Sequence, residues 1–237
     1  MCGIVGVYGS KETSIFLAIK GMRGLQHRGQ EGLGFAAGDT DFDTILVERG
    51  QGEVSQVLPN INISRLQRNT VIGQTRYSTV GENNLNNVQP AMSSFQRKPI
   101  AVLQNGSLIN LSEISRHTKK DYTGLSDTQA IADLLSQSEA SSIEAAIIET
   151  TKQLRGSYNL IILFNNEIFL VRDPDGFHPF QIGRGPQGEH VVASESYAFD
   201  FMRGNLLRDI RAGEYLRISN EGISTFHQTH RPGNPHL

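Results

Sequence analysis

The 237-residue sequence has little of three things: cysteine, basic excess and long apolar runs. Its single cysteine, Cys2, cannot form an intrachain disulfide or a multi-cysteine metal site, which excludes disulfide-stabilised secreted scaffolds and structural metal sites of that kind. The 22 basic residues are outnumbered by 24 acidic ones and form no basic block, so we expect no nucleic-acid partner. The most apolar run, residues 160–164, has the length of a strand, so we expect no membrane span.

A leader peptide and a disordered chain are not expected either. The first residues lack the basic region and apolar core of a signal peptide, which favours a cytoplasmic protein. Charged residues make up 19% of the chain and are spread along it, unlike those of a disordered polyelectrolyte. We expect one domain over residues 1–229 and a flexible, proline-containing tail over residues 230–237. Three late histidines lie in or beside this tail, and we expect neither a metal nor a cofactor there: His227, His230 and His236.

Apolar periodicity and turn residues predict an α+β fold. Strands are expected at residues 4–8, 44–48, 70–75 and 100–104, and a helix at residues 14–25. Two further helices are expected behind capping boxes formed by Ser126 with Gln129 and Ser141 with Glu144. Hairpins are expected for residues 160–164 with 168–172, 181–183 with 191–193, and 215–218 with 223–226. Because hairpins pair strands antiparallel, a doubly wound parallel sheet is not expected.

Cys2 is a candidate nucleophile because of its position in the chain. If Met1 is removed, the new α-amino group has a pKa of roughly 7.7 to 8.0 and can accept the thiol proton, directly or through a water. The alternative is a small residue that only helps a strand to pack.

Two glycine-bearing segments supply candidate partners. Arg76 ends an expected buried strand, and a buried guanidinium needs an anion. That anion is either a substrate carboxylate or, in an internal salt bridge, one of the Asp or Glu residues. Asn105 and Gly106 carry an amide side chain and a backbone N–H that together suffice for an oxyanion hole. A plain Asn-Gly turn is the alternative there.

A series of motifs in one order resembles the class II glutamine amidotransferases. The motifs are Cys2-Gly-Ile-Val-Gly, Leu25-Gln-His-Arg-Gly-Gln-Glu, Gly73-Gln-Thr-Arg-Tyr-Ser-Thr, Asn87-Val-Gln-Pro, Asn105-Gly, Gly156-Ser-Tyr, Arg172-Asp-Pro-Asp-Gly-Phe-His-Pro and Ala193-Ser-Glu-Ser. The resemblance covers roughly residues 2 to 226 and is greatest to the glutaminase half of the amidophosphoribosyltransferases.

The resemblance implies a fold and a set of roles. The fold is that of the N-terminal-nucleophile hydrolases, a four-layer αββα sandwich with two stacked antiparallel sheets. L-glutamine is the implied substrate, and its side-chain amide is hydrolysed through a Cys2 thioester to glutamate and ammonia. The implied catalytic residues are Cys2, Asn105 and Gly106. The implied substrate-binding residues are Arg76 for the α-carboxylate, Asp127 for the α-ammonium, Thr79 on a closing loop, and Arg28 and Gly29 beside the nucleophile. Residues 80–88, with four asparagines and one glycine, have the composition of such a loop, and helix N-capping is the alternative role of Asp127.

The sequence departs from the family pattern in two respects. Gln74 and Gln104 occupy positions where the family usually has histidine, so the site keeps hydrogen-bonding groups there but loses two titratable rings. No phosphoribosyltransferase domain or phosphate-binding signature is expected in this chain. The ammonia acceptor is therefore expected on another domain or chain, and a homo-oligomer is left open.

Two other functions remain as alternatives. The same nucleophile could act on another γ-glutamyl amide, since Arg76 and Asp127 would recognise any free γ-glutamyl head. A regulatory subunit that keeps only the fold is the second alternative, although it would have no need of the intact set of site residues.

Overall fold

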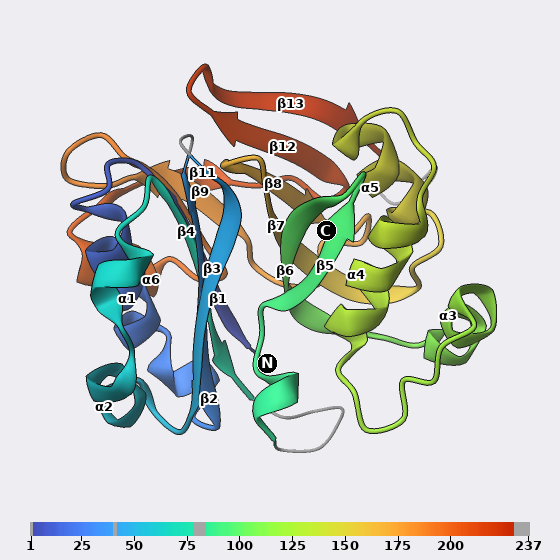
Figure 1. The fold of residues 1–237 in the computed structure, drawn as a ribbon. Coiled ribbons are helices and arrows are strands. Elements are labelled where there is room, and N and C mark those ends of the chain that lie inside the picture. The colour runs from blue at the N-terminus through green and yellow to red at the C-terminus, as the bar shows by residue number, and fades with distance from the viewer. Residues whose placement is uncertain (1, 40–41, 78–83, 230–237) are drawn as a thin grey trace.

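The computed structural model describes residues 2–39, 42–77 and 84–229. Two antiparallel sheets stack face to face, and helices cover the outer face of each (Figure 1). The helices are α1 (Ser14–Gly24), α2 (Val54–Val57), α3 (Leu111–Thr118), α4 (Asp127–Gln137), α5 (Ile143–Thr151) and α6 (Tyr197–Met202), with short 3-10 helices η1 (Gln26–Arg28), η2 (Leu58–Asn60), η3 (Ile63–Leu66) and η4 (Leu85–Asn87). Across the described ranges, no helix is long and apolar enough to cross a membrane.

The first sheet has seven strands in the order β11-β9-β10-β1-β4-β2-β3. Their bounds are β1 (Gly3–Tyr8), β2 (Gly32–Asp39), β3 (Phe42–Gln51), β4 (Thr70–Arg76), β9 (Gln181–Arg184), β10 (His190–Ala193) and β11 (Asn205–Asp209). The second sheet has six strands in the order β13-β12-β8-β7-β6-β5. Their bounds are β5 (Ala91–Phe95), β6 (Lys98–Leu108), β7 (Gly156–Phe164), β8 (Glu167–Arg172), β12 (Glu214–Ser219) and β13 (Gly222–Gln228).

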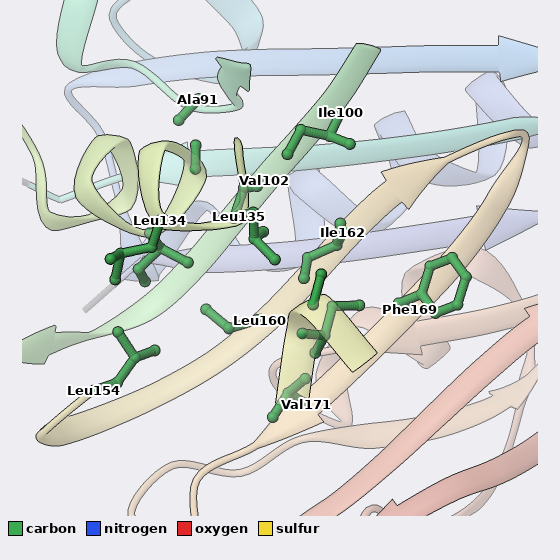
Figure 2. Close-up of a cluster of buried hydrophobic side chains, with 14 of the residues drawn as sticks. Ala91, Ile100, Val102, Leu134, Leu135, Leu154, Leu160, Ile162, Phe169 and Val171 are labelled. Atoms are coloured by element: carbon green, nitrogen blue, oxygen red, sulfur yellow. The ribbon is translucent and has the colours of Figure 1, made fainter. Parts of the chain in front are cut away.

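Three apolar clusters hold four layers together. Side chains of α1, α2 and α6 pack on the outer face of the seven-stranded sheet. A second cluster, which includes Ile4, Ile72 and Leu103, fills the space between the two sheets. The third lies between the six-stranded sheet and helices α4 and α5, where Leu134 and Leu135 meet Leu160 and neighbouring strand residues (Figure 2). This arrangement confirms the expected α+β sandwich with two stacked antiparallel sheets.

Local patterns predict many of these elements correctly. The three expected hairpins are present as the pairs β7–β8, β9–β10 and β12–β13. Asn165 and Asn166 both adopt the left-handed conformation in the first of them, at φ 48° and 62°, which asparagine tolerates better than most residues. The expected helix at residues 14–25 is α1, and the expected buried strand at residues 70–75 is β4, which continues to Arg76.

Three local expectations need correction. The strand expected at residues 100–104 continues through Asn105 and Gly106 as part of β6, so the Asn-Gly pair forms no turn. Glycine is required at residue 106 for this extension. Its φ is 149°, and a Cβ there would lie 2.1 Å from Ser157 O on the neighbouring strand. The cap of α5 is Ser142 rather than Ser141, since the Ser142 hydroxyl accepts the N–H of Ala145. Ser126 does precede α4, but its side chain makes no capping bond.

The sequence patterns did not single out several elements. Helices α3 and α6 and strands β2, β5 and β11 were not among the predicted segments. Strand β2 is rich in glycine and alanine, and all five residues of β11 are exposed, so neither gives the apolar alternation of a half-buried strand. The expected tail at residues 230–237 lies outside the described residues.

Candidate active site

Cys2 stands at the start of β1, the central strand of the seven-stranded sheet. The following glycine is required for close packing, because a Cβ on Gly3 would lie 2.6 Å from Thr75 Oγ1 on β4. The Cys2 thiol lies 3.7 Å from the backbone oxygen of Tyr77. The candidate nucleophile is therefore held at the edge of the inter-sheet space, where the chain enters the sheet.

Side-chain alternation places several predicted site residues in that same space. Cys2 precedes Ile4 by two residues, and Gln74 and Arg76 follow Ile72 at intervals of two, so all share the face that turns toward the second sheet. On β6, Asn105 follows Leu103 in the same way. The inner faces of the two sheets thus bring the nucleophile, the guanidinium and the Asn105 amide to one end of the sandwich.

The environment of Cys2 favours a neutral thiol at rest. Burial raises the pKa of the Cys2 thiol, and the Arg76 charge and the Gln74 side chain act in the opposite direction. A neutral thiol needs a base at the moment of attack, and an α-amino group on the same residue is a suitable one.

Arg28 holds the backbone of Cys2. Its Nε donates to the carbonyl oxygen of Cys2 at 3.2 Å, and its Nη1 lies 3.2 Å from Glu195 Oε1. The other Glu195 oxygen is 2.6 Å from His27 Nε2. Arg28 therefore lies beside Cys2 and contacts its main chain rather than its thiol, and the substrate-binding role that the resemblance implied stays a prediction.

Gly29 allows η1 to approach β4. A Cβ at this position would lie 2.5 Å from the carbonyl carbon of Arg76 and 2.6 Å from its oxygen, so only glycine fits without displacing the strand end.

Arg76 itself is buried, with 3% of its surface exposed, and its Nη1 donates to the backbone oxygen of Asn87. Burial lowers the pKa of the Arg76 guanidinium, and Cys2 and Glu31 oppose that effect.

Asn105 has a fully buried amide that finds no hydrogen-bond partner in the described part of the chain. Its exposure is 0%, and neither Oδ1 nor Nδ2 contacts a partner among the described residues. Buried amides are normally satisfied, and each exception calls for an explanation. A donor held at the nucleophile end of the sandwich without a protein acceptor has the properties of an oxyanion-hole group.

Asp127 is the first residue of α4 and is 5% exposed. Its Oδ2 accepts the backbone N–H of Leu108 at 2.7 Å, and its Oδ1 has no hydrogen-bond partner in the described parts of the chain. Burial raises the pKa of the Asp127 carboxyl, and the Leu108 N–H partly offsets this. Among the described contacts of Asp127 there is no ion pair with Arg76, so these two residues do not form a salt bridge with each other.

The remaining predicted site residue, Thr79, lies outside the described residues, as do residues 80–83 of the expected loop. Sequence reasoning assigned no role to three buried or bridging residues near the site: Asn87, Gln89 and Glu195. The signal for them was present, since each belongs to a motif that carried the resemblance, but the motif alone does not say what its side chains touch.

Comparisons with known proteins agree with this geometry. The family model described as a glutamine amidotransferase domain matches residues 74–200. A chloroplastic amidophosphoribosyltransferase of Glycine max is 33% identical over 94% of this chain and 40% of that protein, and the amidophosphoribosyltransferase of Staphylococcus aureus (strain MRSA252) is 31% identical over 97% and 47%. The solved glutamine phosphoribosylpyrophosphate amidotransferase from B. subtilis, in complex with ADP and GMP, superposes with a TM-score of 0.86 at 31% identity over 94% of this chain and 48% of that one. The chain thus spans less than half the length of these relatives.

Proposed function

Because the chain belongs to the glutamine amidotransferase domain family, we propose that it hydrolyses the side-chain amide of L-glutamine to glutamate and ammonia through a thioester on Cys2. The two stacked sheets are the N-terminal-nucleophile hydrolase fold, as the sequence resemblance implied. In this fold the nucleophile acts from the chain terminus, so the proposal requires removal of Met1.

The first half-reaction forms the thioester. The α-amino group of Cys2 takes the thiol proton, and the sulfur attacks the carbonyl carbon of the glutamine side chain. The resulting oxyanion accepts hydrogen bonds from Asn105 Nδ2 and the Gly106 N–H. When this intermediate collapses, the carbon–nitrogen bond breaks, the α-ammonium returns the proton to the leaving nitrogen, and ammonia departs.

The second half-reaction regenerates the enzyme. The α-amino group activates a water molecule, which attacks the thioester, and the same two donors stabilise the second oxyanion. Collapse releases the thiolate, which recovers the proton, and glutamate leaves. Cys2 thus supplies both the nucleophile, its thiol, and the base, its α-amino group. The Asn105 side chain and the Gly106 backbone supply the oxyanion donors.

Arg76 and Asp127 are proposed to hold the amino-acid head of the substrate. A guanidinium fork suits a carboxylate, and Asp127 Oδ1, which has no partner among the residues that the structure describes, suits an ammonium. Both side chains are almost fully buried, so their charges act with little screening by solvent.

The observation that carries the proposal is the unsatisfied Asn105 amide. A structural role would pair at least one of its two polar atoms, whereas an oxyanion donor must keep its N–H for the reacting oxygen. The second support is the position of Asn105. It lies near the C-terminal end of β6, and its side chain faces the same inter-sheet space as Cys2.

The ammonia is proposed to pass to an acceptor on another domain or chain. The relatives are amidophosphoribosyltransferases about twice as long as the matched region, which supports a phosphoribosyltransferase domain as the class of acceptor. We also propose a cytoplasmic protein that works in purine biosynthesis. A solved structure of an allosteric regulatory enzyme of purine biosynthesis, 32% identical over 94% of this chain, supports the second part of this proposal.

A combined experiment tests the proposal on one sample. Intact mass reports Met1 removal, and a glutamate-release assay reports activity. We expect active protein to lack Met1, and Cys2→Ala or Cys2→Ser to remain folded but inactive. A glutamine-like electrophile should add one label, at the single cysteine. Normal turnover in protein that retains Met1, or in Cys2→Ala, would overturn the mechanism.

A further inference from the structure

Residues 87–90 form a short buried segment that touches both halves of the site. The segment links η4 to β5 and crosses between the two sheets, and all four of its residues are buried. Its contacts fall into two groups, one made by Asn87 and one by Gln89.

Asn87 connects the two residues proposed to bind the substrate head. Its backbone oxygen accepts a hydrogen bond from Arg76 Nη1. Its side-chain Oδ1 accepts the N–H of Ser126 at 2.9 Å, and its Nδ2 donates to Gly124 O at 2.7 Å. Ser126 immediately precedes Asp127, so one buried asparagine sets the distance between the cation and the carboxylate.

Gln89 connects the nucleophile side to the oxyanion side. Its side chain brackets the backbone of Gln104: the Gln104 N–H donates to its Oε1 at 2.7 Å, and its Nε2 donates to the Gln104 carbonyl at 3.2 Å. Gln104 immediately precedes Asn105 on β6. The backbone N–H of Gln89 also donates to Gln74 Oε1 at 3.0 Å on the opposite sheet.

This last contact fixes the orientation of the Gln74 amide. Because Oε1 accepts the N–H of Gln89, the Nε2 end must point away from it, and that atom is buried without a hydrogen bond of normal length among the described residues. The Gln74 side chain lowers the pKa of the Cys2 thiol, as expected of a donor that faces the sulfur.

Glycines in β2 bring the segment this close to the first sheet. A Cβ on Gly34 would lie 1.9 Å from the Gln89 carbonyl oxygen, and one on Gly32 would lie 2.7 Å from Val88 Cγ2. Arg49 Nη2 donates to the carbonyl oxygen of Pro90. The segment is therefore held by the first sheet and in turn holds Gln104 of the second.

We propose that Asn87 and Gln89 are positioning residues with separate tasks: Asn87 sets the spacing of Arg76 and Asp127, and Gln89 sets the spacing of Cys2 and Asn105. The inference rests on the proposed glutamine hydrolysis. Groups that hold the substrate head act in the ground state and affect KM, whereas groups that align nucleophile and oxyanion donor act in the transition state and affect kcat.

The test compares Asn87→Ala and Gln89→Met in the processed chain that lacks Met1. Each loses two hydrogen bonds, so we expect changes of about tenfold. Asn87→Ala should raise KM by that factor and leave kcat within about twofold, and Gln89→Met should do the reverse. Gln228→Met is the control, because that glutamine also donates to a backbone oxygen, at 2.8 Å from Ala212, but lies on edge strand β13.

A second readout needs no glutamine. Cys2 is the only cysteine, so the pH profile of its alkylation by iodoacetamide reports this thiol alone. Gln89→Met keeps the backbone N–H that binds Gln74 but releases the segment from Gln104, so that N–H and the Gln74 amide it orients should move. The profile should then shift to higher pH, whereas Asn87→Ala and Gln228→Met should leave it unchanged. Should the first pair fold poorly, Asn87→Leu and Gln89→Leu remove the same side-chain hydrogen bonds while keeping most of the buried volume and adding no charge, and they should change the same parameters.

The outcomes separate this inference from the proposed function. Inactive wild-type protein would refute glutamine hydrolysis, and the alkylation profiles would then decide the role of Gln89 alone. Equal shifts of KM and kcat in both variants, with matching losses of thermal stability, would reduce the segment to a structural element. An unchanged alkylation profile in Gln89→Met would also overturn the inference.

Discussion

Asp127 Oδ2 accepts the backbone N–H of Leu108 at 2.7 Å, which ties the first turn of α4 to the end of the strand that carries Asn105. Leu108 lies three residues beyond Asn105 on β6. The carboxylate is thereby held near the proposed oxyanion donor, and its other oxygen has no hydrogen-bond partner within the described ranges. This geometry leads to predictions about substrate capture, its pH dependence and the reaction itself.

Asp127→Asn should raise KM for glutamine with little change in kcat. The substitution keeps the shape and removes the charge that faces the α-ammonium. Leaving one charge of such a pair without its partner typically costs about 2 kcal/mol or more, or about 30-fold in kcat/KM. Asp133→Asn is a matched control, since Asp133 lies on the same helix, is also 5% exposed, and pairs with Lys120. Similar KM values in the two variants would contradict the assignment.

The acid limb of kcat/KM should belong to Asp127. Burial raises its pKa above the ordinary value of 3.8, so the carboxylate becomes protonated, and loses its attraction for the ammonium, at a higher pH than an exposed aspartate would. A pH profile of kcat/KM should fall on the acid side through that raised pKa, and the fall should be absent in Asp127→Asn.

The same pKa shift predicts that Asp127 lowers the stability of the folded protein at neutral pH relative to acid pH. The folded protein holds this proton more tightly than the unfolded chain, so the contribution of Asp127 to the free energy of unfolding decreases as pH rises from 3.8 through the raised pKa. Denaturant titration at neutral pH should therefore find Asp127→Asn more stable than the wild type.

Arg76→Lys should weaken glutamine binding although it keeps the charge. Lysine cannot reproduce the planar fork that binds a carboxylate in two places, and it cannot maintain the same contact with the Asn87 oxygen. Steady-state kinetics should show a raised KM, and glutamine analogues without the α-carboxylate should be poor substrates of the wild type. Arg65→Lys on the exposed surface is the control. A wild type that accepts such analogues as well as glutamine would argue that Arg76 serves only the fold.

Asn105→Ala should lower kcat by about 10²- to 10³-fold, the usual cost of one oxyanion donor. KM should change little, because the donor meets a charge that is present only in the transition state. Asn69→Ala is a suitable control, since Asn69 donates to Gly9 O beyond the far end of β1. A pure KM effect in Asn105→Ala would place this side chain in ground-state binding instead.

Gly29→Ala should destabilise the protein and raise KM together. The added methyl would lie 2.5 Å from the carbonyl carbon of Arg76, so the end of β4 must shift, at a cost of about 1 to 3 kcal/mol. Gly38→Ala on β2 is the control, because a Cβ there meets its nearest neighbour at an ordinary 3.7 Å. Denaturant titration and kinetics measure the two effects. If Gly29→Ala matches the control in both, close packing against Arg76 is not what requires glycine here.

Short-range patterns in the sequence were sufficient for several parts of this protein. The asparagine pair at residues 165–166 predicted a hairpin because asparagine tolerates left-handed backbone. The three-four spacing of apolar residues predicted α1, and the position of Cys2 directly after Met1 indicated a candidate nucleophile. The order of the motifs indicated the family, which the comparisons confirm. The first three of these signals each lie within one short segment, whereas the order of the motifs extends along nearly the whole sequence.

Only the tertiary structure decided how those residues meet. The Asn-Gly pair at residues 105–106 reads locally as a turn, but pairing with β7 keeps it in an extended strand. The roles of Asn87, Gln89 and Glu195 depend on partners 11 to 168 residues away, across two sheets. Local preferences determine where a helix or hairpin forms, whereas strand register and the stacking of the two sheets determine which buried amides and charges face one another.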